Sequence, residues 1–250
     1  MLPSTQTRSD GQVVDTETAS EFMREALEKI TAIDQNAIAD ELSVKSGRFH
    51  DLLARPRRLG ADELRFILRS IFSTRRRVAA FLGGEVGERL PEWIHDLIHA
   101  DASVQDRFQT FYDRLEAFPE TVRHDLASEL LHFTKPDDYW LWTRWVWDRT
   151  TRTGALPLVT LEEYELTGGT AGDTYLRVGR ATAFVHETGK AAGFTRIGAS
   201  TFGVDVYLAC VYGVYVYTTV RMRMTQEFNR VIPELPELCR RFLGVYRMES

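Results

Sequence analysis

The sequence predicts a mainly α-helical protein, in which a small N-terminal helical module precedes a larger, aromatic-rich helical domain. Apolar residues recur at spacings of three and four along most of the chain, as they do on one face of a helix. The 250 residues are 44% hydrophobic, which is enough to bury a core. No segment of about 20 to 50 residues repeats, so the periodicity does not indicate a solenoid.

The N-terminal module is expected over residues 18–84, after a disordered tail at residues 1–17. Thr18 and Glu21 have the spacing of a capping box, which opens the first helix. Gly83 and Gly84 follow a short basic segment and mark the expected domain boundary. The module is expected to contain helices at residues 18–33, 34–42, 46–54 and 61–72.

The C-terminal helical domain is expected over residues 85–250. Residues 137–148 carry four of the five tryptophans and are apolar on nearly all sides, which predicts a helix buried at the centre of the domain. Residues 156–166 are compatible with one short β-hairpin, and Gly189 and Gly244 are expected to end helices. The expected helices are residues 91–100, 104–117, 120–133, 137–148, 174–187, 204–229 and 233–243.

Charge and composition exclude several classes of protein. The formal charge of -5 gives no global attraction to nucleic acid or to anionic membranes, so such binding needs a local basic patch. The most apolar stretch, residues 206–220, is shorter than the roughly 20 residues of a membrane span. Cys210 and Cys239 belong to no C-x-x-C motif, and the first residues lack the apolar core of a signal peptide. We therefore expect a cytoplasmic protein without membrane contact.

Residues 37–53, AIADELSVKSGRFHDLL, have the pattern of two short helices joined by a turn. The small Ala39 would let the helices cross closely, Val44 would fill the turn, and Phe49 would hold the second helix against the first. Residues 20–72 thus resemble the helix-turn-helix domain of repressor-like DNA-binding proteins, with Ser43 where a turn glycine is common. The resemblance implies duplex DNA as the partner, and a homodimer, because such modules usually act in pairs.

The charge distribution supports the same hypothesis. Residues 45–77 hold ten lysines and arginines against Asp51, Asp62 and Glu63, a net charge of +7 within an acidic chain. A basic block of this kind is what contacts with phosphates require. The residues predicted to contact nucleic acid are Lys45, Ser46, Arg48, Arg55, Arg57 and Arg58.

Two Glu-x-x-His pairs raise a metal-binding hypothesis, because di-iron helical bundles use this spacing. Glu92 and His95 form one pair, with His99 a turn later, and Glu129 and His132 form the other. The apolar stripe of the first helix lies opposite its Glu and His residues, which therefore face water. On the second helix Glu129 is expected near the edge of the core and His132 farther out, so a buried two-metal site is not expected.

The common sequence motifs of hydrolases, zinc proteases, dinucleotide-binding folds and P-loop proteins are not present. The sequence therefore identifies no catalytic residue and no cofactor, and an enzyme is not the favoured class. The leading hypothesis is a cytoplasmic regulatory or accessory protein that binds DNA through its N-terminal module. An accessory factor that docks an acidic protein partner is the second hypothesis, and a metal-dependent helical-bundle enzyme is the third.

Overall fold

The computed structural model describes residues 30–54, 59–191, 200–223 and 233–246, and six isolated positions, 15, 17, 18, 21, 24 and 198. This part of the chain is mainly helical, as predicted, and contains an isolated bridge between Asp148 and Thr153 but no β-strand. The expected tail and most of the expected first helix lie outside the described residues. The helices are α2 Ala32–Leu53, α3 Ala61–Ser70, α4 Val78–Leu82, α5 Gly84–His99, α6 Val104–Arg114, α7 Glu120–Thr134, α8 Ala171–Ala191, α9 Gly203–Arg223 and α10 Leu235–Leu243.

Helix α2 is one continuous helix, so the prediction of two helices joined by a turn was wrong. A capping box between Thr31 and Asp34 begins it, and the Ser43 hydroxyl donates to the Ala39 carbonyl inside the helix at 2.9 Å. The exposed Val44 fills no turn. The buried residues follow each other at spacings of four, three, four and four, which is a single unbroken helical stripe. The residues of this stripe are Ile38, Leu42, Lys45, Phe49 and Leu53, and Gln35 and Ser46 of the same helix are buried as well.

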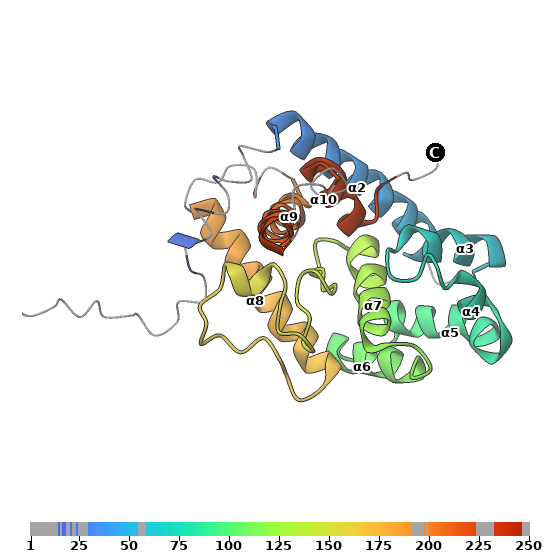
Figure 1. Ribbon diagram of the computed structural model, residues 1–250. Helices are drawn as coiled ribbons and strands as arrows, with labels where there is room; N and C mark the ends of the chain where they lie inside the picture. The colour runs from blue at the N-terminus through green and yellow to red at the C-terminus, as the bar shows by residue number, and fades with distance from the viewer. Residues whose placement is uncertain are drawn as a thin grey trace, which may run out of the picture.

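Helix α7 lies at the centre of the fold, between α2 on one side and α5 and α6 on the other (Figure 1). Its residues from Asp125 to Thr134 are buried without interruption. Helix α10 packs against both α9 and α2, and α8 packs against α6. Side chains of α7 are thus surrounded by chain segments far apart in the sequence.

Residues 135–155 form turns and irregular chain rather than the predicted Trp-rich helix. Their burial was predicted correctly, since Trp142 is fully buried. Side chains of α7 bind the backbone of this segment instead of a helical partner: Ser128 Oγ accepts from the amide of Trp142 at 2.5 Å, and Asp125 from the amide of Arg144 at 2.9 Å. Buried backbone groups satisfied in this way do not need a helix.

Several predicted boundaries also changed. Residues 156–166 contain a 3₁₀ turn at Leu156–Leu158 and no hairpin. Helix α8 continues past Gly189, which therefore does not end it. Gly244 does end α10, with a left-handed φ of 72°. The last residues of the helix expected at 204–229 lie outside the described residues.

The division at Gly83 and Gly84 is not confirmed, because one cluster of buried apolar side chains includes residues from both sides of it. It extends from Ile30 to Val245 and contains residues of α2 and α3 together with residues of α5 to α10. Among the described residues, none of the helices is both long and apolar enough to cross a membrane.

Candidate nucleic-acid interface

Lys45, predicted to contact DNA, is fully buried. Its Nζ lies 2.7 Å from Glu129 Oε2 and donates to the Leu243 carbonyl at 3.0 Å. The same nitrogen lies 4.0 Å from the centre of the Phe133 ring. Lys45 therefore joins α2 to α7 and to the end of α10, and it presents no charge to solvent.

Ser46 and Arg48, the other predicted contact residues that the structure describes, are not fully exposed either. Ser46 is buried, and its hydroxyl donates to the Phe133 carbonyl at 3.0 Å. The half-buried Arg48 lies over the Phe66 ring at 5.5 Å. Arg55, Arg57 and Arg58 lie outside the described residues. Lys45 and Ser46 do not lie on the surface, because the uninterrupted helix α2 directs both side chains toward α7.

Two adjoining pockets lie near these buried residues, and they share Phe72 and Arg75. The first, here called the α7 pocket, has a volume of about 380 Å³ and reaches Asp125 and Glu129 of α7. The second, the α3 pocket, has a volume of about 640 Å³ and lies beside Arg65 and Arg69 of α3. We call the two adjoining pockets together the hollow, which is lined by residues from α3 to α9.

Seven arginines and three carboxylates line this hollow, and we call the arginines the arginine face. Arg65 pairs with Asp62 at 2.7 Å, and Arg241 pairs with Glu237 at 2.5 Å. None of the other five has a carboxylate within ion-pair distance among the described residues. The complete arginine face is Arg65, Arg69, Arg75, Arg76, Arg77, Arg144 and Arg241.

The turn between α3 and α4 holds three of these arginines in place. Thr74, at the centre of the turn, is fully buried, and its hydroxyl donates to the Leu68 carbonyl at 2.6 Å. Burial and the positive charges of Arg76 and Arg241 lower the pKa of Arg75. Like charges crowded in this way make the site favourable for a bound anion.

Phe72 stands between the two pockets and is 41% exposed, which is unusual for a side chain of its size in this protein. The Arg75 guanidinium lies 4.3 Å from the centre of its ring. A guanidinium over an aromatic ring is held with its hydrogen-bond donors directed outward. Phe72 therefore gives the arginine face a flat apolar surface at its centre.

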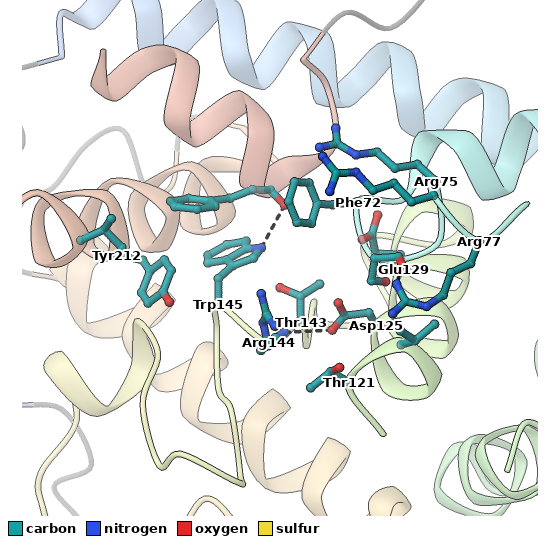
Figure 2. Close-up of a pocket in the computed structure, with 15 residues that line it drawn as sticks. Phe72, Arg75, Arg77, Thr121, Asp125, Glu129, Thr143, Arg144, Trp145 and Tyr212 are labelled. Atoms are coloured by element: carbon teal, nitrogen blue, oxygen red, sulfur yellow. Dashed lines mark hydrogen bonds between the residues drawn. The ribbon is translucent and has the colours of Figure 1, made fainter. Parts of the chain in front are cut away.

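Aromatic side chains form one side of the α7 pocket, opposite Arg77 (Figure 2). The indole nitrogen of Trp145 donates to the Phe242 carbonyl at 3.0 Å, which fixes the Trp145 ring. The Phe242 ring stacks on Trp145 with centroids 6.0 Å apart and meets Tyr212 edge to face at 5.1 Å. These rings come from the irregular segment, α9 and α10.

Buried polar groups also line the α7 pocket. Thr143 is 3% exposed, and its hydroxyl has no hydrogen-bond partner among the described residues; the same holds for the buried hydroxyl of Ser73. Glu129 is also buried. Burial raises its pKa to about 7, against the opposing effect of Lys45. The pocket therefore combines arginines, aromatic rings, hydroxyls and carboxylates.

The metal-binding hypothesis has no support in the described part of the chain, where no three His, Cys, Asp or Glu side chains are grouped to hold an ion. The expectation that Glu129 and His132 lie toward the surface was wrong, because both are buried. His132 pairs with Asp205 at 3.1 Å, and His99 forms a hydrogen bond with the Leu53 carbonyl at 2.8 Å. These histidines are occupied by contacts within the protein.

Most of the arginine face lies within the basic block at residues 45–77, but none of its residues was among those predicted to contact nucleic acid. Arg65, Arg69 and the Arg75–Arg77 run belong to that block, whereas Arg144 is brought to it only by folding. Comparison with known proteins adds no further information: no family model, no curated protein and no solved structure matches this chain.

Proposed function

We propose that this protein binds DNA through the arginine face, as a cytoplasmic regulatory or accessory protein. The observation that carries the proposal is a group of five arginines around two adjoining pockets, for which the described residues provide no ion pair, in a chain whose formal charge is -5. These five are left available to an external anion.

Phosphate is the anion that suits this face best. Guanidinium groups bind phosphate oxygens in a two-pronged manner, and a duplex offers phosphates at regular intervals. The arginines extend from α3, across the α3–α4 turn, to residue 144, so they present several positive charges rather than one. We therefore retain the DNA-binding hypothesis, but we propose the lining of the two pockets as the binding site in place of the second half of α2.

The test is a titration of a fluorescent 20-base-pair duplex of mixed sequence over a range of salt concentrations. Arg69→Ala and Arg76→Ala should each weaken binding and lower the slope of log K against log salt by about 1, because each removes one phosphate contact. Arg180→Ala, an exposed arginine on α8 outside both pockets, is the matched control and should bind as the unchanged protein does.

Absence of binding to the duplex at low salt would contradict the proposal.

An acidic protein partner that docks on the arginine face is the second candidate, and the same five arginines favour it. Competition by polyglutamate that equals competition by DNA would favour it. Enrichment of one sequence from a random duplex pool would support a regulatory role, and light scattering would measure the expected homodimer.

A further inference from the structure

We propose that the α7 pocket holds a single unpaired nucleotide of the bound DNA strand. This inference rests on the proposed function, because the arginine face must first hold the phosphates. The chemistry to be recognised is a nucleoside phosphate: an anion at the edge, a flat ring and hydrogen-bonding groups at its far end.

The dimensions and charge of the pocket suit such a ligand. Its volume of about 380 Å³ lies within the range of small-molecule sites. Arg75, Arg76 and Arg77 line one side, and Arg144 lines another. A phosphate at the edge would thus be met by cations from two segments of the chain, while the base pointed inward.

Aromatic groups are placed where a base would need them. Phe72 lines both pockets, and Trp145 lines the α7 pocket with its ring fixed by the hydrogen bond to Phe242. Every base has a flat face that stacks on aromatic side chains, and strand-binding proteins use such stacking without reading sequence. An exposed Phe72 is explained if a base covers it.

The polar groups of the pocket match the edge of a base. Buried hydroxyls normally have a hydrogen-bond partner, and the hydroxyls of Ser73 and Thr143 have none among the described residues. Asp125 uses Oδ1 to accept from the Arg144 amide, which leaves Oδ2 available as an acceptor. A base that carries N–H groups and ring nitrogens would satisfy this set, whereas a phosphate alone would be repelled by the carboxylates.

A base in a duplex is inside the stack, so only an unpaired or extruded base could enter. The protein should therefore prefer a duplex with one unpaired guanine over the same duplex fully paired, by about tenfold, the effect of one stacked base. The experiment compares the two duplexes, equal in length and labelled identically, by fluorescence anisotropy with the full chain.

Two variants locate the preference in the α7 pocket. Phe72→Ala should remove most of the tenfold preference for the duplex with the unpaired guanine. Thr143→Val keeps the shape of the side chain and should reduce the preference about fivefold, because it removes one hydrogen bond. Phe184→Ala is the matched control, since Phe184 is another exposed phenylalanine, 45% exposed on α8, and does not line either pocket.

The outcomes separate this inference from the proposed function. Equal binding of the two duplexes overturns the inference and leaves the proposed function standing, whereas failure of both duplexes to bind overturns both. A preference that survives Phe72→Ala and Thr143→Val also overturns the inference, since bulged DNA is then bound for its flexibility. Binding of free guanosine monophosphate with equal binding of the duplexes would assign the pocket to a free nucleotide instead.

Discussion

The buried ion pair between Lys45 and Glu129 removes the positive charge of Lys45 from the surface of the protein. Lys45 Nζ has a carboxylate, a carbonyl and an aromatic ring around it, so its charge is compensated inside the protein. A buried ion pair adds little stability compared with apolar residues of the same volume, but removal of one partner leaves an uncompensated charge.

Lys45→Met should lower the free energy of unfolding by about 3–5 kcal/mol, because it leaves Glu129 buried without a cation. The double variant Lys45→Met/Glu129→Gln should recover most of the loss, since no buried charge then remains. Urea denaturation near pH 8 measures both. If Lys45→Met were neutral in stability, Lys45 would have to be exposed, contrary to the structure.

Two buried threonines allow a matched comparison at the same scale. Thr143→Val should leave stability unchanged or raise it by about 1 kcal/mol, because its buried hydroxyl has no partner among the described residues. Thr74→Val should lower stability by about 1 kcal/mol, because the Thr74 hydroxyl donates to Leu68. Thermal denaturation of the two variants tests this, and equal effects would refute the difference in hydrogen bonding.

At the scale of the secondary-structure element, α2 is the helix in which the structure differs from the helix-turn-helix prediction. The same residues that would stabilise two short helices across a turn also form one continuous stripe when no turn intervenes. The capping box at Thr31 and the absence of a helix-breaking residue between Ala32 and Leu53 favour the single helix. Gly47 is tolerated within it.

Val44 provides a direct test, because its side chain is 55% exposed and a substitution there acts mainly on the backbone. Val44→Pro should cost about 3 kcal/mol or more, since proline inside a helix removes a hydrogen bond and meets the preceding turn. Val44→Ala, the control, should change stability little. Circular dichroism and urea denaturation report both, and a well-tolerated proline would restore the two-helix interpretation.

At the scale of the whole molecule, two buried ionisable pairs link α7 to its surroundings. Glu129 pairs with Lys45 of α2, and His132 pairs with Asp205 of α9. Burial raises the pKa of Glu129 to about 7 from an ordinary 4.5. Burial opposes the charged form of His132, but Asp205 and the Tyr139 carbonyl outweigh it and raise the His132 pKa above 6.5.

Both shifts predict that stability falls as the pH rises. The raised pKa values mean that the folded protein still holds protons on Glu129 and His132 after the unfolded chain has released them. The free energy of unfolding should therefore decrease from about pH 4.5 to about pH 7 because of Glu129, and decrease further above pH 6.5 because of His132. The lowered pKa of Lys45, caused by burial, acts with the opposite sign in the alkaline range below 10.5.

Urea denaturation across this pH range measures the dependence. Glu129→Gln should remove one contribution to the slope. Asp205→Asn should reverse the other, because His132 would then be buried without its carboxylate and its neutral form would be favoured. An unchanged slope in both variants would show that these pairs are not responsible.

The sequence by itself determined the helical class and the approximate extent of α3, α6, α7 and α10. It also determined that the Trp-rich segment is buried and that Gly244 ends a helix. These features depend on neighbours within a few turns of chain, where apolar spacing and backbone preferences act directly. The net charge of residues 45–77 was likewise visible in composition alone.

Only the tertiary structure decided which of those charges are exposed. Lys45 and Arg75 belong to the same basic block, yet one is enclosed by α7 and α10 and the other lines a pocket. The pocket also needs Asp125, Trp145 and Tyr212, which meet only when distant segments pack together. Burial and charge pairing depend on residues far away along the chain, and for that reason local sequence patterns could not predict the site.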